Sequence, residues 1–223
     1  MIKVLDLFSG IGGISRGLEA TGGFETVAFC EIDPFCREVL KKHYPDIPIY
    51  EDVKTLHYDD SFPKIDMICG GFPCVSVSVA GKRKGEKDDR WLWPEFYRIV
   101  CEFKPEWVLV ENVPGLLTAK NKEGIKGGLF GGILRDFSEI GYDVQWQVLS
   151  ARQFGAPHLR KRVFLVAHPN STRIRCSDRN AIHEGRPTGE SGRAGIPEAT
   201  GWQDGSTIAD IGTTGTILAN AHC

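Results

Sequence analysis

Short apolar segments alternate with helix-like segments along the first 168 residues, and this alternation constrains the fold more than any other feature of the sequence. Several of these segments are continuously apolar, which is typical of strands that helices cover on both faces of a parallel sheet. The pattern therefore predicts an α/β fold with a doubly wound, mostly parallel sheet. The predicted strands are Ile2–Phe8, Thr26–Glu31, Ile65–Gly70, Trp107–Glu111, Val144–Leu149 and Val163–His168. The predicted helices are Ile14–Ala20, Pro34–His43, Pro94–Phe103 and Leu129–Ile140.

The character of the sequence changes after about residue 168. Residues 167–223 include eight glycines and no lysine, and their apolar side chains are few and scattered. The run GRPTGESGRAG, residues 185–195, has neither helical nor strand periodicity. Because so little apolar area does not offset the entropy of ordering a chain, we expect a folded domain over residues 1–168 and an irregular segment over residues 169–223.

The composition excludes several classes of protein. Lysine and arginine number 27 against 29 acidic residues, so the net charge of −2 argues against a broadly basic nucleic-acid binder and leaves only a local basic patch open. No apolar run approaches the roughly 20 residues of a membrane span, and the N-terminus lacks the features of a signal peptide. Seven scattered cysteines suit a reducing compartment better than a disulfide scaffold. We therefore expect a cytoplasmic protein with no membrane partner.

The first predicted strand runs directly into a glycine-rich turn, SGIGG, at residues 9–13. Glycine lets the backbone turn tightly and approach a ligand closely, and the N-terminus of the following helix offers free N–H groups. The turn is not the dinucleotide fingerprint, because Ser15 stands where the third glycine belongs. Taken alone, it is better explained as a tight connection between strand and helix.

Two acidic residues strengthen the functional interpretation of this turn. Glu31 closes the second strand 21 residues after Gly10, close to the spacing at which a carboxylate receives ribose hydroxyls. Asp52 is placed to end a short third strand, where it could meet an adenine amino group. Taken singly, each acid is more often a solvated loop carboxylate. Together they favour an adenosine-containing ligand.

A candidate nucleophile follows the strand that ends at Gly70. The segment GGFPC, residues 70–74, fixes a turn that would hold the thiol of Cys74 at the end of the sheet, where nearby cations would lower its pKa. Cysteine is usually a small buried hydrophobe, and we accept that explanation for Cys30, Cys69 and Cys101, which lie within strand or helix patterns. No pair of cysteines and histidines has zinc spacing, so we expect no metal.

A carboxylate and two arginines complete the set of candidate residues. Glu111 ends a run of four apolar residues, so it is expected to be partly desolvated, which suits proton donation. A capping or loop acid is an equally good explanation of Glu111 in isolation. Arg160 and Arg162 alternate just before the last predicted strand, so their side chains could point to one face, although a solvated basic edge is the ordinary explanation.

Taken together, these segments resemble the cytosine-5 DNA methyltransferase family. Residues 6–13 (DLFSGIGG) resemble its first motif and residues 71–74 (GFPC) its catalytic motif. Glu111–Val113 matches the third landmark of the family, and Arg160–Arg162 its paired arginines. The order and spacing of the four motifs also agree with the family, over roughly residues 1–168.

The resemblance implies a Rossmann-like S-adenosylmethionine-dependent catalytic domain over residues 1–168, followed by the start of an incomplete target-recognition region. It implies that Cys74 adds to carbon 6 of cytosine and that Glu111 binds ring N3. Arg162, with Arg160 nearby, would hold the carbonyl at position 2 and help to orient the thiol. The partner is then double-stranded DNA, from which the target base is flipped. The implied cofactor-binding residues are Asp6, Phe8, Ser9, Gly10, Gly12, Gly13, Glu31, Ile32, Asp52, Val53 and Pro73.

The sequence also departs from the family. Val75 follows the predicted nucleophile where glutamine is usual, His158 replaces the glutamine before the paired arginines, and Trp91 stands where glycine is common. Residues 81–90, GKRKGEKDDR, suit the loop that closes over the flipped base. Neither a target-recognition region nor the closing motif of the family is found, so we expect either a second polypeptide or a further part of this one to supply recognition and closure. Membership in a restriction system is an expectation from the family.

Three alternatives stay open at this point. A tRNA cytosine-5 methyltransferase shares the same motifs, and the net charge does not choose between DNA and tRNA. A catalytically silent module that binds only cofactor or DNA is disfavoured by the joint presence of Cys74, Glu111 and Arg162. A nicotinamide oxidoreductase is the weakest alternative, because Ser15 breaks the glycine fingerprint.

Overall fold

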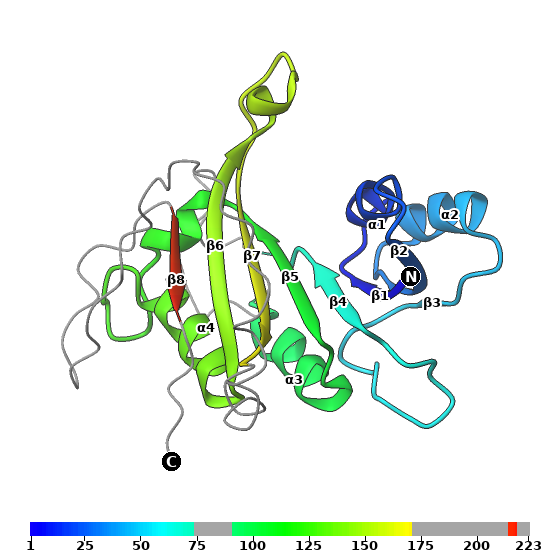
Figure 1. Ribbon diagram of the computed structural model, residues 1–223, viewed down its shortest axis with the longest axis horizontal. Helices are drawn as coiled ribbons and strands as arrows, with labels where there is room; N and C mark the ends of the chain where they lie inside the picture. The colour runs from blue at the N-terminus through cyan, green and yellow to red at the C-terminus, as the bar shows by residue number, and fades with distance from the viewer. Residues whose placement is uncertain (74–90, 171–213, 218–223) are drawn as a thin grey trace, which may run out of the picture.

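The computed structural model of the protein describes residues 1–73, 91–170 and 214–217 (Figure 1). These residues form one eight-stranded sheet with flanking helices. The strands are β1 (Ile2–Leu7), β2 (Phe24–Cys30), β3 (Ile49–Tyr50), β4 (Met67–Gly70), β5 (Trp107–Asn112), β6 (Tyr142–Ser150), β7 (Lys161–Pro169) and β8 (Thr214–Ile217). The helices are α1 (Gly13–Glu19), α2 (Pro34–His43), α3 (Trp93–Phe103) and α4 (Gly128–Glu139), with the 3-10 helices η2 (Pro114–Thr118) and η3 (Ala151–Phe154).

The strand order is β3-β2-β1-β4-β5-β7-β6-β8. Strands β1 to β5 pair in parallel, whereas β7 runs antiparallel to both β5 and β6, and β8 runs antiparallel to β6. The predicted α/β fold with a doubly wound, mostly parallel sheet is therefore confirmed. Because the parallel strands point the same way, the segments that follow β1, β2, β4 and β5 emerge at one edge of the sheet, here called the carboxyl edge.

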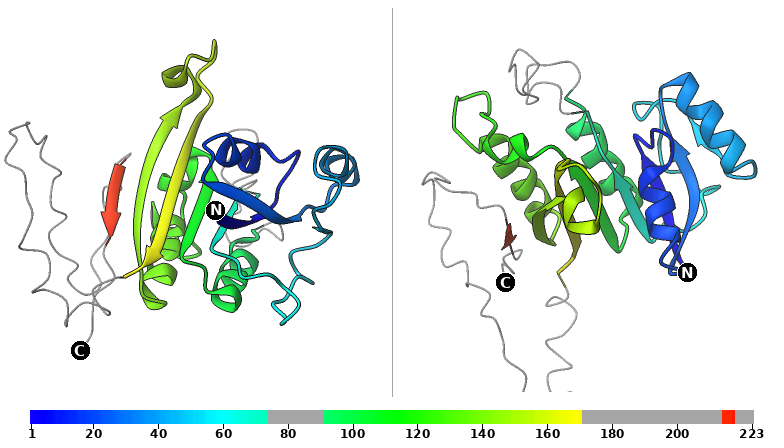
Figure 2. Two further views of the ribbon diagram at one scale, coloured as in Figure 1. Left: turned by 45° about the vertical axis from the view of Figure 1, so that its right-hand side comes forward. Right: turned by 90° about the horizontal axis from the view of Figure 1, so that it is seen from above.

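Alternating side chains of the central strands are buried on opposite faces of the sheet. Val4 and Met67 pack with Leu18 of α1 on one face. Leu7 and Ile68 belong to a larger core on the other face, which includes the buried sides of α3 and α4. Figure 2 shows helices on both sides of the sheet. This two-sided covering explains why the central strands read as continuous apolar runs rather than as alternating patterns.

The helix boundaries follow from local chemistry. The side chain of Asp33 accepts hydrogen bonds from the N–H groups of Phe35 (2.8 Å) and Cys36 (3.2 Å), and Pro34 occupies the first turn of α2, where no N–H is needed. Helix α2 has the predicted bounds. Helix α3 likewise carries Pro94 in its first turn.

One part of the segment expected to be irregular is a strand. Residues 214–217 form β8, which pairs with β6 so that Gly215 lies opposite Trp146. A side chain at Gly215 would collide with the indole of Trp146, so glycine suits this position. The expectation of an irregular segment over 169–223 is wrong at these four residues, and most of that segment (171–213 and 218–223) lies outside the described residues.

The β6–β7 hairpin projects beyond the carboxyl edge (Figure 1). The two strands pair without interruption from Tyr142 opposite Pro169 to Ser150 opposite Lys161. Because β5 ends with Asn112 opposite Val163, the hairpin continues past the end of β5 and carries its connection outward. Among the described helices, none is long and apolar enough to cross a membrane.

Candidate functional site

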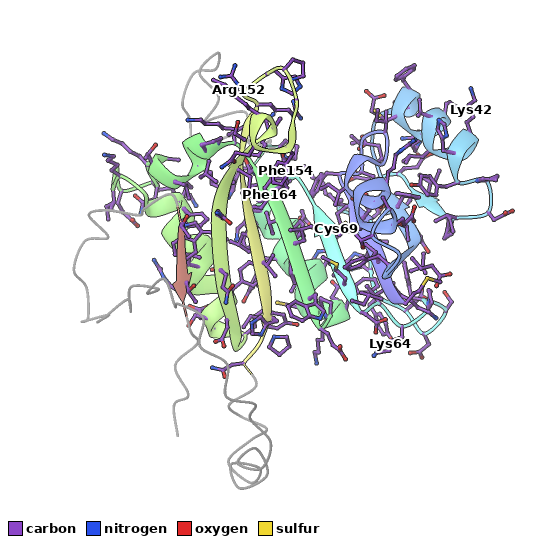
Figure 3. The ribbon with its side chains drawn as sticks, turned by 45° about the horizontal axis from the view of Figure 1, so that its top comes forward. Lys42, Lys64, Cys69, Arg152, Phe154 and Phe164 are labelled. Atoms are coloured by element: carbon purple, nitrogen blue, oxygen red, sulfur yellow. The ribbon has the colours of Figure 1, made fainter. Side chains whose placement is uncertain are left out.

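The predicted site residues that the structure describes lie toward the carboxyl edge, around the point where the strand order changes direction between β1 and β4. In doubly wound sheets this point opens a crevice in which ligands bind. The glycine turn follows β1, Glu31 follows β2, and the turn leading to residue 73 follows β4. Glu111 is the second-to-last residue of β5. Figure 3 shows side chains along this edge.

The glycine turn is held to the end of β2 by Glu31. The carboxylate of Glu31 accepts a hydrogen bond from the N–H of Gly10 at 2.7 Å and another from the N–H of Asp33 at 2.8 Å. The turn needs left-handed backbone at Phe8 (φ 53°), Gly10 (φ 53°) and Gly12 (φ 82°). Each carboxylate oxygen can accept a further hydrogen bond, so Glu31 both supports the turn and offers acceptors toward a ligand.

Asp6 lies beneath the turn and not within reach of solvent. It is fully buried, and its Oδ2 accepts a hydrogen bond from the hydroxyl of Ser15 in α1 at 2.7 Å. Burial raises the pKa of Asp6 to about 6, against the lowering effect of the Ser15 hydroxyl and the neighbouring Cys69 thiol. Its Oδ1 is buried without a hydrogen-bond partner among the described residues. Asp6 is therefore placed to support the turn from below. Ser15, which departs from the dinucleotide fingerprint, is its partner.

Asp52 and Val53 follow β3 in a loop that Arg98 of α3 anchors. Arg98 donates to the carbonyl oxygens of Val53 (2.7 Å) and Leu56 (3.0 Å). It also pairs with Glu95 and Glu102. The spacing Glu95, Arg98, Glu102 places the three charges on one helix face, a signal that the sequence analysis did not use.

This part of the site combines acceptors, apolar surface and open space, as an adenosine-containing ligand requires. Ile32, directly after Glu31, is 68% exposed, and Val53 is buried. A Cβ added at Gly10 or Gly13 would meet no atom within 4 Å, so there is space beside the turn. The described residues contain no cluster of three or more His, Cys, Asp or Glu side chains that could hold a metal ion.

The second half of the site is an ion pair between β5 and β7. Nε of Arg162 lies 2.7 Å from Oε1 of Glu111, and the two side chains are 25% and 24% exposed. The guanidinium holds the Glu111 carboxylate in one orientation. The expectation of a partly desolvated carboxylate fits this burial, although the arginine partner was not part of that expectation.

The turn after β4 packs directly against Glu111. A Cβ at Gly71 would lie 2.8 Å from Oε2 of Glu111, so a larger residue here would require the Glu111 carboxylate to shift. The side chain of Asn112 donates to the carbonyl oxygen of Phe72 at 3.2 Å and accepts from the N–H of Val113 at 2.8 Å. Asn112, which the sequence analysis did not single out, therefore locks the turn that leads into Pro73.

Cys74, Val75 and the loop of residues 81–90 lie outside the described residues. The sequence predicts that three described cysteines, Cys30, Cys69 and Cys101, are small buried hydrophobes, and the first two are fully buried. Cys101 is partly buried, and all three are free thiols. Burial raises the pKa of Cys30 to about 12 and that of Cys69 well above its ordinary value.

Arg160 lies immediately before β7, and Arg162 lies within it. Arg160 is exposed, and among the described residues it has no ion pair with Glu111. Its backbone is left-handed (φ 28°), so the extended alternation that would have placed residues 160 and 162 on one face is interrupted before β7 begins at Lys161. The alternation on which the expectation of one shared face rests is therefore broken at Arg160, and a shared role for the two arginines stays a prediction.

Comparison with known proteins identifies the family. The sequence profile of C-5 cytosine-specific DNA methylases matches residues 2–211. The Type II methyltransferase M.NgoBV of Neisseria gonorrhoeae is 40% identical over 173 residues, covering 74% of this chain and 41% of that protein. M.Bsp6I of Bacillus sp. (strain RFL6) is 35% identical over 173 residues, covering 76% of this chain and 53% of that protein.

Solved structures agree with this result. A protein encoded within an E. coli prophage and assigned as a DNA modification methyltransferase superposes with a TM-score of 0.62 at 31% identity, covering 78% of this chain and 48% of that chain. The S. pombe Dnmt2 methyltransferase shares the fold at 23% identity, with a TM-score of 0.62, and the match covers 76% of this chain and 51% of that one. This chain matches about half or less of the length of these proteins. The resemblance read from the four motifs is confirmed, and the chain belongs to the C-5 cytosine-specific DNA methylase family.

Proposed function

We propose that the chain carries the catalytic core of a DNA cytosine-5 methyltransferase. The observation that supports this most directly is the Glu111–Arg162 ion pair, packed against Gly71 three residues before Cys74. A carboxylate and a guanidinium thus lie together at the carboxyl edge, against the turn that precedes Cys74 in the sequence. The free thiols among the described cysteines suit a reducing, cytoplasmic setting.

S-adenosyl-L-methionine is the proposed cofactor, held by the glycine turn, Glu31, Ile32, Asp52 and Val53. When bound, it supplies an electrophilic methyl group at the crevice. Glu31 would accept hydrogen bonds from the ribose hydroxyls, and the exposed Ile32 side chain would cover the adenine ring. Asp6 and Arg98 would not touch the cofactor. Asp6 would support the glycine turn, and Arg98 would hold the loop that carries Asp52 and Val53.

The chain's own residues prepare the cytosine. The Cys74 thiolate forms a carbon–sulfur bond to carbon 6, and the displaced ring electrons make carbon 5 nucleophilic. Glu111 hydrogen-bonds or protonates ring N3 and so stabilises the charge that this addition creates, while Arg162 holds the carbonyl at position 2. After carbon 5 has received its methyl group, loss of the carbon 5 proton to a base restores the double bond and expels the thiolate.

The test measures transfer of a labelled methyl group to duplex DNA and to tRNA in parallel. Cys74→Ser should abolish transfer while leaving cofactor binding within severalfold. Glu111→Gln should lower turnover more than it raises the Michaelis constant for DNA, whereas Glu106→Gln, an exposed acid beside β5, is the matched control. More than a few per cent of wild-type turnover in Cys74→Ser would overturn the mechanism.

The same assay separates the alternatives. Preferential transfer to tRNA would replace the DNA assignment with the tRNA one. A covalent adduct on a 5-fluorocytosine duplex that requires Cys74 excludes a silent binding module. A thermal shift with S-adenosylhomocysteine and none with NAD excludes the nicotinamide enzyme.

A further inference from the structure

The tip of the β6–β7 hairpin, residues 151–160, is an ordered protrusion beyond the carboxyl edge (Figures 1 and 3). The N–H of Ala151 donates to the carbonyl oxygen of Leu159 at 2.9 Å, which closes the base of the tip. At the same point the Ser150 hydroxyl donates to the Leu159 carbonyl at 2.7 Å, and the Ser150 N–H donates to Oε1 of Gln153, also at 2.7 Å. These bonds give the tip a fixed shape.

This fixed shape holds large apolar side chains in water. Phe154 is 74% exposed and Leu159 is 53% exposed. Because the hydrogen-bonded turn keeps the Phe154 ring away from the core, the protein does not gain the free energy of burying that ring. This points to a role for the ring in binding. Figure 3 shows Phe154 and Arg152 together at this end of the hairpin.

The charge on the tip indicates the kind of partner. Residues 151–162 contain four cations, Arg152, Arg160, Lys161 and Arg162, and no acidic residue, in a chain whose net charge is −2. Arg162 is paired with Glu111. Arg152, Arg160 and Lys161 are exposed, and no described acid pairs with them. Such a cluster of cations, without acids and beside exposed apolar side chains, fits a nucleic acid better than a protein surface, because a nucleic acid offers negative phosphates and bases that can stack.

The tip also lies next to the proposed chemistry. It leads directly into Arg162, and Phe164, two residues further along β7, is paired across the sheet with Glu111. A duplex that presents a base to Glu111 and Arg162 would therefore run within reach of the tip.

We propose that the hairpin tip is a DNA-binding element outside the target-base pocket, with Arg152 on the phosphodiester backbone and Phe154 against a sugar or base. The inference rests on the proposed function, because the duplex bound is the one that supplies the cytosine. Arg152 contributes electrostatically and therefore in a salt-dependent way, whereas Phe154 contributes by contact and is nearly insensitive to salt.

The experiment measures binding of the full 223-residue chain to a fluorescent duplex across a series of salt concentrations. Arg152→Gln should weaken binding roughly three- to tenfold and lower the slope of log affinity against log salt by about 1. Phe154→Ala should weaken binding roughly tenfold at every salt concentration and leave that slope unchanged. Lys42→Gln and Phe35→Ala, also exposed and both on α2, are the matched controls and should change neither quantity.

The outcomes separate this proposal from the proposed function. Unchanged DNA affinity in both tip variants overturns the proposal, even if the wild-type chain transfers methyl groups. Loss of a self-association in Phe154→Ala with unchanged DNA affinity would assign the tip to protein contact instead and also overturns it. A wild-type chain that binds DNA through the tip but transfers methyl groups only to tRNA supports the tip assignment and overturns the DNA assignment of the proposed function. All four side chains are exposed, so melting temperatures should be unchanged and a folding defect is distinguishable.

Discussion

The buried carboxyl group of Asp6 should make the stability of the protein depend on pH in a direction opposite to that of most acids. Burial raises its pKa in the folded state to about 6, from an ordinary value of 3.8. The folded state therefore binds the Asp6 proton more tightly than the unfolded state does. The resulting stabilisation is complete below about pH 4 and is lost as the pH rises through 6.

The size of this effect follows from the same two values. A difference of about two pKa units corresponds to about 3 kcal/mol between the extremes of pH. Between pH 4.5 and pH 8, where only part of the transition is sampled, the unfolding free energy should fall by about 2 kcal/mol on account of Asp6 alone. Asp6→Asn cannot titrate and should lack this contribution, while its side-chain oxygen can still accept the Ser15 hydrogen bond.

Urea unfolding followed by circular dichroism at several pH values provides the assay. The quantity of interest is the difference in unfolding free energy between wild type and Asp6→Asn as a function of pH. It cancels the titration of all other groups and any uniform destabilisation of the variant. Asp66→Asn is the control: Lys64 lowers the pKa of Asp66, so its titration falls below the sampled range. Parallel profiles for wild type and Asp6→Asn would refute the reasoning.

Three further predictions concern the two halves of the site. Glu31→Ala should weaken cofactor binding by about 1–3 kcal/mol in calorimetry through the loss of charged hydrogen bonds, whereas Glu25→Ala on the exposed side of β2 should not; equal affinities would make Glu31 a purely structural acid. Gly71→Ala should lower turnover roughly tenfold by displacing Glu111 from Arg162. Gly132→Ala is the control and should leave turnover unchanged, because an added Cβ there meets no atom within 4 Å. A fully active Gly71→Ala enzyme would contradict the packing argument. Arg98→Met should reduce cofactor affinity severalfold and the free energy of unfolding by about 1–3 kcal/mol, because the carbonyl oxygens of Val53 and Leu56 lose their hydrogen bonds to Arg98. Arg135→Met is the matched control. A loss of stability with unchanged cofactor affinity would limit Arg98 to a structural role.

The parts of the fold that the sequence predicted well are those that local patterns determine. Helix α2 was predicted to the residue, because Asp33, Pro34 and an apolar stripe mark its start and course. The central strands were found because helices bury both of their faces, which makes them continuously apolar. The position of Glu31 could be predicted for a different reason. Parallel strands all end at the same edge of the sheet, so a residue at the end of such a strand lies at that edge.

The remaining features depend on contacts between distant segments. Strand β8 has only four residues, and its pairing rests on Gly215 fitting beside Trp146, a relation that no local pattern reveals. The Glu111–Arg162 pair depends on the antiparallel register of β5 and β7. Asp6 looked like a ligand-binding acid by its motif, yet its place on the face that packs against α1 buries it completely.

Backbone strain at the carboxyl edge shows why the site resists prediction from sequence. Phe8 and Arg160, at opposite ends of the site, both have left-handed backbone, which is costly for residues other than glycine. Such conformations persist only where neighbouring bonds leave no alternative. Beside Phe8, the Ser9 hydroxyl donates to the carbonyl oxygen of Asp6 at 2.6 Å and the Ser9 N–H to that of Cys30 at 3.2 Å. Beside Arg160, the bonds to the Leu159 carbonyl fix the hairpin tip in the same way. Because these constraints lie within the chain itself, the bonds of the protein hold the shape of the glycine turn and of the tip, and under the proposed function ligand binding would not have to supply the free energy of ordering them.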